Sequence, residues 1–426
     1  MQDQPHYISP DQLCIGLYIH LDRGWMDHPF TFNNFKISSA AQIAQIQALK
    51  LEKLRYDPMR SDCEPLSLEH AESHGSAPPE VPAVTPTPDI EASQISGKSE
   101  RLKLLHESIR TCEKEFMTTS QTVKDALSGL NAKPGTAREA AAALVTHMVE
   151  SVLTESDIVL HAISDRRSGE TGYLHPLNVT VLALMLSKSI DMTPADAHDL
   201  GMAAIFHDIG KAEIPDRILL KTDPLNKAEQ GLLEQHCATG TRMALQSGLS
   251  ERAGRIILQH HELMDGSGYP KHLKGEEIDS LARLLAIANT FDNLCNPVNL
   301  AAAMTPYEAL AHMFSTLRGK FDASLLKILI KSLGVYPPGS VVMLSDNAYG
   351  MVISVNPSAS LRPYVMLYKP DVARETPEVI NLREEPGINI GKCMRPGQLP
   401  REVLDYLSPR KRVSYYFNKD TLEIEN

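Results

Sequence analysis

Apolar residues recur at helical spacing through the middle of the chain. Leu105 and Ile109 belong to an approximate 3.6-residue period over 101–130, and Pro134-Gly135 separates it from a second helical pattern over 136–163. Because this period places apolar side chains on one face, we expect two long amphipathic helices here. They can form a dimer surface, act as a relay, or serve as ordinary helices of the following domain, and the pattern leaves these interpretations open.

Further helical patterns follow, with short polar breaks between them. Thr193 can cap a helix that begins at Pro194, which marks one helix start clearly. The pattern therefore predicts an all-helical core. Its expected helices span 175–189, 193–207, 227–246, 250–262, 281–294, 306–317 and 322–333.

A small α/β unit is expected at the beginning of the chain. Apolar residues on both faces of 13–21 indicate a strand, helical spacing over 38–49 indicates a helix, and 51–56 reads as a closing strand. The sole Trp, Trp25, is followed closely by three Phe, which is what a small core requires. We therefore interpret this unit as a packing or sensory module, with ligand binding as the alternative.

After Gly334 the pattern changes from helices to strands. The run over 341–355 is apolar around a polar turn at Asp346-Asn347, which predicts two β-strands, and 364–368 reads as a third. The remainder, from 370 to 426, is polar and mixed and predicts no defined element. A small β-rich appendage is expected here.

Composition completes the predicted organisation. Residues 61–100 are rich in Pro, Ser, Glu and Ala and contain few apolar residues, which is typical of a flexible linker. The fold class is therefore multidomain and mainly α, in keeping with a length of 426 residues. The predicted parts are a small N-terminal α/β domain (5–60), a flexible linker (61–100), a helical domain with two leading helices (101–335), and a β-rich C-terminal appendage and tail (336–426).

The charge and the cysteines narrow the function and the compartment. A formal net charge of -11 gives no general attraction for nucleic acid polymers or anionic membranes, so any phosphodiester must be bound by local positive charge. Six scattered cysteines without a Cys-x-x-Cys pair suit reduced thiols. The N-terminus has no signal pattern, and no apolar run reaches the ~18 residues of a membrane span. We expect a cytoplasmic protein without a membrane span.

Two histidine-rich motifs carry the chemistry. The first, HDIGK, spans 207–211, and the second, HHELMDGSGYP, spans 260–270. Imidazoles are common ligands of transition metals, and one carboxylate can bridge two ions. With His175 and His236 nearby in the sequence, the motifs predict a two-metal site. Lone histidines on helices are usually structural, so His147, His161 and His312 are interpreted as ordinary residues.

The two motifs in this order resemble the HD-GYP family, the metal-dependent phosphodiesterases that hydrolyse the bacterial second messenger cyclic di-GMP. The likeness extends from about Gly172 to Pro297. The sequence LDRGWMDHPF at 21–30 also resembles a small N-terminal domain that precedes some members. The resemblance implies two divalent metal ions (Fe, Mn or similar), with Asp208 bridging them. It implies His175 and His207 on one metal and His236, His260 and His261 on the other.

The resemblance also implies substrate contacts. Lys211 would bind a phosphate oxygen, whereas the alternative is a surface salt bridge. Gly268, Tyr269 and Pro270 would rim the substrate site and meet partner proteins with GGDEF domains, the synthases of cyclic di-GMP. The glycine-rich loop is in any case a tight turn. Glu262 and Asp265 are expected to hold this loop and to orient histidines.

The chain departs from the family pattern at several positions. The family motif I-A-D-x-x-D-A-L reads IANTFDNL at 287–294, so Asn289 stands where an aspartate ligand is expected and Asp292 is interpreted as structural. An amide oxygen is neutral and binds metal more weakly than a carboxylate. A third metal would need a glutamate at Thr171, so two metals are expected. Val298 and Ala301 replace basic residues that grip phosphate in other members.

Three functions remain open at this point. The first is hydrolysis of cyclic di-GMP to the linear dinucleotide pGpG, with further cleavage to GMP left open. The second is a degenerate module that binds cyclic di-GMP or a GGDEF partner without turnover, which Asn289 favours. The third is hydrolysis of another nucleotide, against which the GYP loop argues. A homodimer remains an option through the two long helices.

Overall fold

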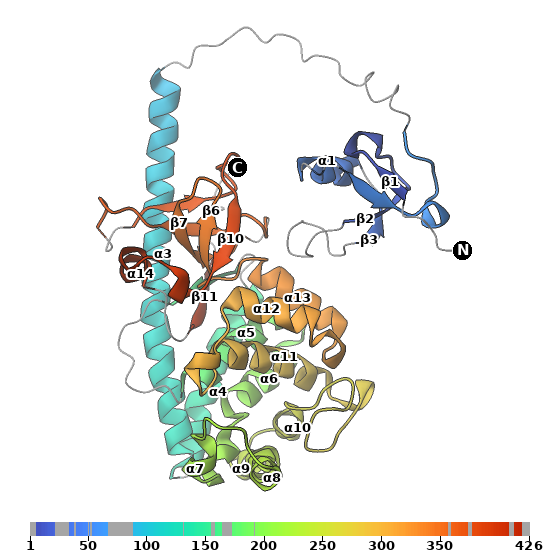
Figure 1. Ribbon diagram of the computed structural model, residues 1–426. Helices are drawn as coiled ribbons and strands as arrows, with labels where there is room; N and C mark the ends of the chain where they lie inside the picture. The colour runs from blue at the N-terminus through green and yellow to red at the C-terminus, as the bar shows by residue number, and fades with distance from the viewer. Residues whose placement is uncertain are drawn as a thin grey trace. The chain divides into compact units, whose positions relative to one another are not determined.

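A computed structural model of the chain divides into two compact units, residues 1–95 and 96–426 (Figure 1). Trp25 and the predicted linker residues 67–87 fall in the gaps between the described ranges. The structure describes residues 6–21, 34–37, 40–49, 51, 53–66, 88–130, 132–154, 158–163, 173–190, 192–356, 359–373, 377–408 and 413–419.

Up to residue 66, the described part of the first unit is a small antiparallel sheet with one α-helix, which confirms the predicted α/β unit. The strand order is β1-β4-β2-β3. The strand expected over 13–21 is shorter, because Gly16 adopts a positive φ of 105° and turns the chain just before the strand begins. Leu17, Ile19 and Ile46 are fully buried between sheet and helix. The elements are β1 (His6–Ile8), β2 (Tyr18–His20), β3 (Asn34–Lys36), α1 (Ala40–Ala48) and β4 (Leu54–Tyr56).

Residues at the start of the predicted linker pack with this sheet. The Tyr18 amide donates to Ser61 Oγ at 2.8 Å, and the Leu66 amide donates to the Gln12 carbonyl at 2.9 Å. At the other end of the predicted linker, the first long helix begins at Pro88, earlier than the expected 101. Proline suits the first turn of a helix because it needs no amide donor there. The domain boundaries as a whole stay a prediction.

The second unit has the expected helical core. Nearly every side chain of α5 is buried, and this helix packs against α4, α6, α11 and α13. An apolar surface on all sides is typical of a helix at the centre of a bundle. Thr193 caps α6 as predicted, accepting a hydrogen bond from the Asp196 amide at 3.1 Å. The helices are α3 (Pro88–Gly129), α4 (Pro134–Thr154), α5 (Leu174–Lys188), α6 (Pro194–Phe206), α7 (Asp216–Leu219), α8 (Lys227–Glu234), α9 (His236–Gln246), α10 (Glu251–Gln259), α11 (Ser280–Cys295), α12 (Pro306–Ser315) and α13 (Ala323–Leu333).

Two helix predictions were wrong in detail. The helix expected over 136–163 ends at Thr154, and Ile158–Ala162 form a strand, β5, because strands from far along the chain pair with it. The single helix expected over 227–246 is interrupted at Gln235, whose amide bonds the Leu232 carbonyl three residues back. His236 therefore stands at the first position of a new helix, α9.

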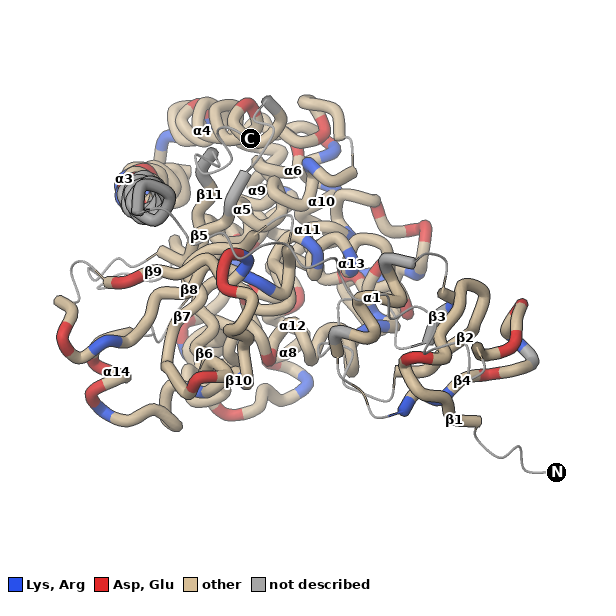
Figure 2. The backbone as a smooth tube through the Cα atoms, turned by 90° about the horizontal axis from the view of Figure 1, so that it is seen from above, with Lys and Arg blue, Asp and Glu red and all other residues tan. Residues whose placement is uncertain are grey.

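In the described residues, seven strands form one sheet in this unit (Figure 2). The path is β10-β6-β7-β5-β11, with β8 beside β7 and β9 beside β8. The two strands expected around Asp346-Asn347 and the third after them are confirmed, whereas the elements after 370 were missed because each is short and polar residues surround it. The remaining elements are β6 (Val341–Leu344), β7 (Tyr349–Ser354), β8 (Tyr364–Leu367), β9 (Val379–Asn381), β10 (Ile390–Met394), α14 (Arg401–Leu407) and β11 (Tyr415–Lys419).

Strand β11 joins the sheet to the helical core. It pairs with β5 on one side and contacts α5, and Tyr415 is fully buried near Phe291 of α11. The predicted fold class, mainly α with a small N-terminal α/β unit and a β-rich C-terminal region, is confirmed. Among the helices that the structure describes, none is both long enough and apolar enough for a membrane span.

Candidate metal centre

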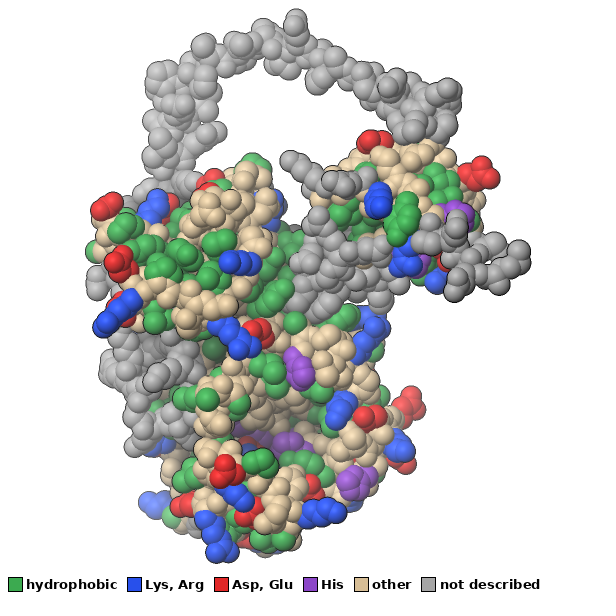
Figure 3. All heavy atoms as spheres, in the orientation of Figure 1, with side chains coloured by type: hydrophobic (Ala, Val, Ile, Leu, Met, Phe, Trp, Pro, Cys, Tyr) green, Lys and Arg blue, Asp and Glu red, His purple; other side chains and the backbone are tan. Residues whose placement is uncertain are grey.

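The helices bring the predicted histidines and Asp208 together from four separate places in the chain. His175 lies in the first turn of α5, and His207 directly follows α6. His236 is the first residue of α9, and His260 directly follows α10. In the space-filling view, histidine side chains lie within a hollow of the helical part (Figure 3). Helix ends that converge in this way build a site inside a bundle.

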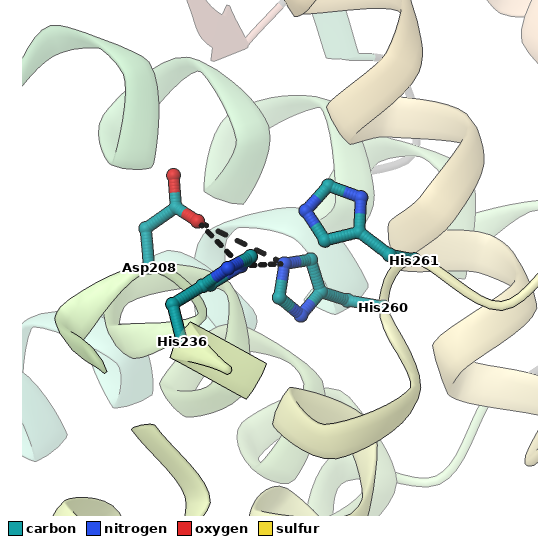
Figure 4. A group of neighbouring side chains, drawn as sticks. All are labelled: Asp208, His236, His260 and His261. Atoms are coloured by element: carbon teal, nitrogen blue, oxygen red, sulfur yellow. Dashed lines mark hydrogen bonds and ion pairs between the residues drawn. The ribbon is translucent and has the colours of Figure 1, made fainter. Parts of the chain in front are cut away.

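Asp208 stands at the centre of the group. Its Oδ2 lies 3.4 Å from His207 Nε2 and 3.6 Å from His175 Nε2. Its Oδ1 lies 3.4 Å from His236 Nε2 and 3.8 Å from His260 Nε2 (Figure 4). Each carboxylate oxygen therefore faces its own pair of imidazoles.

Two sets of possible metal ligands result from this arrangement. His175, His207 and Asp208 form one set, and Asp208 with the histidines of α9 and the second motif forms the other; within each set the ligand atoms lie within 4.8 Å of one another. These are the two groups that the family resemblance implies, and their roles as ligands stay a prediction. The second set is Asp208, His236, His260 and His261.

The histidine rings are held so that Nε2 points into the centre. The Nδ1 atoms of His207, His236 and His260 lie 2.7, 2.6 and 2.7 Å from the carbonyl oxygens of the residues three positions earlier. His175 Nδ1 lies 2.6 Å from a carboxylate oxygen of Asp292. Carbonyl and carboxylate oxygens only accept hydrogen bonds, so each Nδ1 carries a hydrogen, and the lone pair of a neutral ring lies on Nε2.

These lone pairs face one another at short distance. His175 Nε2 and His207 Nε2 are 3.2 Å apart, and His236 Nε2 and His260 Nε2 are 3.3 Å apart. Within the described residues, the buried Oδ1 of Asp208 has no hydrogen-bond partner. Such an arrangement requires positive charge between the atoms. Imidazole nitrogens around a shared carboxylate fit divalent transition metals, so the residues present suit the predicted ions.

The electrostatics favour the protonation states that bind metal. Burial lowers the pKa of His236, and burial followed by the neighbouring imidazoles holds the pKa of His260 and of His261 well below the ordinary value. Burial alone would raise the pKa of Asp208, but the Lys211 ammonium and the His207 ring outweigh it and hold this pKa well below its ordinary range. Neutral imidazoles and an ionised carboxylate are the ligand forms.

Lys211 reaches the centre rather than the surface. It lies in the 3-10 turn Ile209–Glu213, and its Nζ is 2.6 Å from Asp208 Oδ2. The same turn approaches α9 closely: a Cβ atom on Gly210 would run into the His236 carbonyl and the Gly240 amide. A glycine is therefore required between the aspartate and the lysine. The contact of Lys211 with substrate stays a prediction.

The GYP loop, residues 268–270, is held against His261. The Tyr269 ring stacks on the His261 ring with centroids 4.5 Å apart, and the Tyr269 amide donates to the His261 carbonyl at 3.1 Å. A Cβ on Gly268 would collide with the backbone of 261–263, and Pro270 follows through a cis peptide. The loop therefore lies at the edge of the centre.

The two acidic residues of this loop bind its backbone. The carboxylate of Glu262 accepts from the Lys271 amide at 2.6 Å and the Leu273 amide at 2.9 Å, and Asp265 accepts from the Ser267 amide at 2.9 Å. This agrees with the expected role in holding the loop. None of the hydrogen bonds described for these two carboxylates comes from a histidine.

Asn289 lies buried on α11, in the same helix as Asp292. Its Oδ1 accepts a hydrogen bond from Asn293 Nδ2 at 2.7 Å, which occupies one of its two lone pairs. Its role as a metal ligand stays a prediction. Val298 is 60% exposed, and Thr171 lies outside the described residues.

Sequence reasoning missed what surrounds His175. Asn178 and Asn296 both donate to Asp292, the carboxylate behind His175, and both bond the backbone of Val413. One signal for this exists in the sequence: Asn178 is a polar residue inside an almost wholly apolar helix, and buried polar groups need partners.

Comparisons with known proteins show what the chain is similar to. Residues 116–325 match the family model "HD domain", and residues 6–141 match "Domain of unknown function (DUF3391)". The chain is 28% identical to a cyclic di-GMP phosphodiesterase of Pseudomonas aeruginosa, PA4108, over 85% of this chain and 84% of that protein. It is 35% identical to a cyclic di-GMP phosphodiesterase of Thermotoga maritima over 38% of this chain and 46% of that protein.

A third relative bears a different name. The chain is 30% identical to the 3′3′-cGAMP-specific phosphodiesterase 3 of Vibrio cholerae over 44% of this chain and 40% of that protein. The chain thus spans most of the Pseudomonas relative and under half of the other two. The fold and the histidine-aspartate centre define the chain as an HD-domain protein, and the HD domain is a hydrolase fold. Within that class, its two motifs and its relatives assign the chain to the HD-GYP family, as predicted.

Proposed function

We propose that this chain is a metal-dependent phosphodiesterase that hydrolyses cyclic di-GMP to pGpG. One observation carries the proposal. Two imidazoles, those of His175 and His207, face one oxygen of Asp208, and the imidazoles of His236 and His260 face the other. Relatives named cyclic di-GMP phosphodiesterases, one of them matched along most of its length, support the substrate.

The proposed ligands follow the two sets. His175 and His207 would hold one ion, His236, His260 and His261 the other, and Asp208 both. Asn289 would add a neutral amide oxygen in place of a carboxylate. Phosphodiester hydrolysis needs a water molecule with a lowered pKa and neutralisation of the phosphoryl charge. Two divalent ions such as Fe or Mn would provide both.

The other site residues would bind and orient the substrate. The Lys211 ammonium, part-exposed beside Asp208, would donate to a phosphoryl oxygen. Gly268, Tyr269 and Pro270 would form the rim, because the Tyr269 ring is fixed on His261. The same rim is the proposed contact for a GGDEF partner. Further cleavage to GMP, a homodimer and the cytoplasmic location stay predictions.

A second candidate function is binding of cyclic di-GMP without turnover. Asn289 favours it, because a neutral amide in place of a carboxylate leaves that half of the centre with less negative charge to hold an ion. The apolar Val298 and Ala301 favour it as well, because they offer no charge to a phosphate.

Product analysis separates the two candidates. The purified full chain, stripped and reloaded with Mn²⁺ or Fe²⁺, is incubated with cyclic di-GMP, and the products are resolved by chromatography. We expect pGpG. Tight binding of cyclic di-GMP without product would support the second candidate, and turnover of 3′3′-cGAMP at a higher kcat/KM would instead make that dinucleotide the substrate.

Three variants sharpen this test. His236→Ala should abolish pGpG formation, and His312→Ala on α12, outside the centre, serves as the matched histidine control. Asn289→Asp restores the carboxylate and should strengthen metal binding. If pGpG appears only with Asn289→Asp, the natural chain is a receptor and not an enzyme.

A further inference from the structure

His175 is oriented differently from the histidines around it. His207, His236 and His260 each bond a main-chain carbonyl of their own helical turn, so local backbone fixes those rings. His175 Nδ1 instead bonds the side chain of Asp292, at 2.6 Å, from another helix. Its orientation therefore depends on what holds that carboxylate.

Two asparagines donate hydrogen bonds to Asp292. Asn178 Nδ2 on α5 donates to Asp292 Oδ1 at 2.8 Å, and Asn296 Nδ2, just past α11, donates to the same oxygen at 2.8 Å. Oδ2 is left for His175. Asp292 is fully buried and Asn178 is 1% exposed, so water does not compete for these bonds.

Both asparagines are themselves fastened to the backbone just before and within β11. Asn178 Nδ2 and Asn296 Nδ2 donate to the Val413 carbonyl at 2.9 and 2.8 Å. In return, the Val413 amide donates to Asn296 Oδ1 at 2.7 Å, and the Tyr415 amide donates to Asn178 Oδ1 at 3.2 Å. We call the backbone of 413–415 the β11 anchor.

The anchor is a fixed point because β11 is paired along its whole length with β5. Tyr415 pairs with Ala162 and is fully buried, so its backbone cannot shift without breaking the sheet. A network of buried groups whose partners are all present is rigid, whereas loss of one member leaves a buried polar group unpaired. The anchor therefore fixes the orientation of His175 through the two asparagines and Asp292.

We propose that the β11 anchor, through Asn178 and Asn296, is the positioning element for the half of the metal centre that contains His175 and His207. The inference rests on the proposed function only for the role of His175 as a metal ligand. It assigns no role to the anchor in the other half, where the rings of His236 and His260 are fixed by their own turns.

The test is metal affinity, measured without substrate. Mn²⁺ is titrated into the metal-free full chain, and His175→Ala and His236→Ala assign each bound ion to its half. Asn178→Ala and Asn296→Ala should each lower the affinity for the ion of the His175 half about tenfold and leave the affinity for the other ion unchanged. The reason is that loss of a group that orients a ligand costs about 10–100-fold in affinity. Asn299→Ala, an exposed asparagine a few residues on, is the matched control.

The role of the backbone is separated from that of the side chain at position 413. Val413→Ala keeps the amide and carbonyl and should bind both ions as the natural chain does, whereas Val413→Pro removes the donor to Asn296 and should weaken the His175 half. Thermal unfolding of the metal-free variants identifies any that fail to fold, and in that case the asparagine variants decide.

The outcomes distinguish this inference from the proposed function. Two ions with natural affinity in both asparagine variants would overturn the anchor and leave the proposed function intact. Equal weakening of both ions would overturn it too, since that indicates a general loss of structure. A natural chain that binds no ion, or none that His175→Ala affects, would overturn the anchor, and absence of any ion would remove the proposed function as well.

Discussion

The Nε2 atoms of His236 and His260 lie 3.3 Å apart although, in the neutral rings, neither atom has a hydrogen to donate to the other. In each ring the hydrogen is on Nδ1, which donates it to a main-chain carbonyl. The unpaired Oδ1 of Asp208 lies beside both rings. Buried lone pairs that face one another are costly, and the cost is removed when a cation binds between them. The folded chain is therefore expected to gain stability from metal.

The first prediction concerns this gain. Each Mn²⁺ ion, at 100 times its own Kd, should raise the free energy of unfolding by about 2.7 kcal/mol, because an ion that binds only the folded state stabilises it by mass action. Thermal or denaturant unfolding with and without a chelator measures the effect. His312→Ala should keep the full increase, and His236→Ala should lose the part contributed by the ion that His236 would hold; an unchanged increase in His236→Ala would contradict the assignment of that residue.

The second prediction concerns the glycine of the first motif. Gly210→Ala should destabilise the chain by about 1–3 kcal/mol and weaken metal binding, because the added Cβ runs into the His236 carbonyl and the Gly240 amide. Gly231→Ala, on α8 with open space around the added Cβ, should be neutral or stabilising by up to about 1 kcal/mol. Equal unfolding free energies for the two variants would show that α9 can yield to the clash.

The third prediction divides the roles of Tyr269. Tyr269→Phe keeps the ring stacked on His261, so metal affinity should stay unchanged, and a rise in KM alone would assign the hydroxyl to substrate binding. Tyr269→Ala removes the stack and should also lower the affinity for the ion that His236, His260 and His261 would hold. Burial raises the pKa of Tyr269, so its hydroxyl remains neutral at physiological pH. Loss of metal in Tyr269→Phe would contradict this division.

The fourth prediction is a pH dependence of stability from His161 on β5. Burial lowers the pKa of His161 from 6.5 to about 4 in the folded chain. The unfolded chain therefore takes up a proton first as pH falls, so the stability is fully present above pH 6.5 and is lost between 6.5 and 4.

The measurement compares the natural chain with His161→Leu. Between pH 7 and pH 4, the natural chain should lose about 3 kcal/mol more unfolding free energy than the variant, from the difference in pKa between the two states. Chemical denaturation at a series of pH values measures it in the metal-free protein. Parallel pH profiles would mean that His161 is protonated in the folded state.

Local pattern was enough to predict the helices and the histidines of the centre. HDIGK and HHE bring neighbouring histidine and acidic residues to the ends of helices, and Thr193 marked a helix start by its side chain. What could not be predicted depends on partners that are distant in sequence. β5 is a strand because β11 and β7 pair with it, whereas the residues of β5 alone continue a helical pattern.

The same limit applies to the surroundings of the centre. Asp292 was interpreted as structural from its place in the family motif. Its partners His175 and Asn178, both on α5, could not be predicted from α11 alone. The aromatic run Tyr415-Tyr416-Phe417 was a signal for a buried strand inside the polar tail. The sequence analysis included it in the polar and mixed region from 370 to 426 and predicted no element there.

The distance in sequence between Asn178 and Val413 has a consequence for biosynthesis. These partners are 235 residues apart, so at ribosomal speeds of 5–20 residues per second the anchor is synthesised roughly 12 to 47 s after the asparagine. Once residue 261 has been added, the growing polypeptide carries all five histidines, but His175 lacks its support until Val413 has been synthesised. An ion captured on the ribosome would therefore enter the α9–α10 side first, and the α5 side would fill only after the last strand has docked.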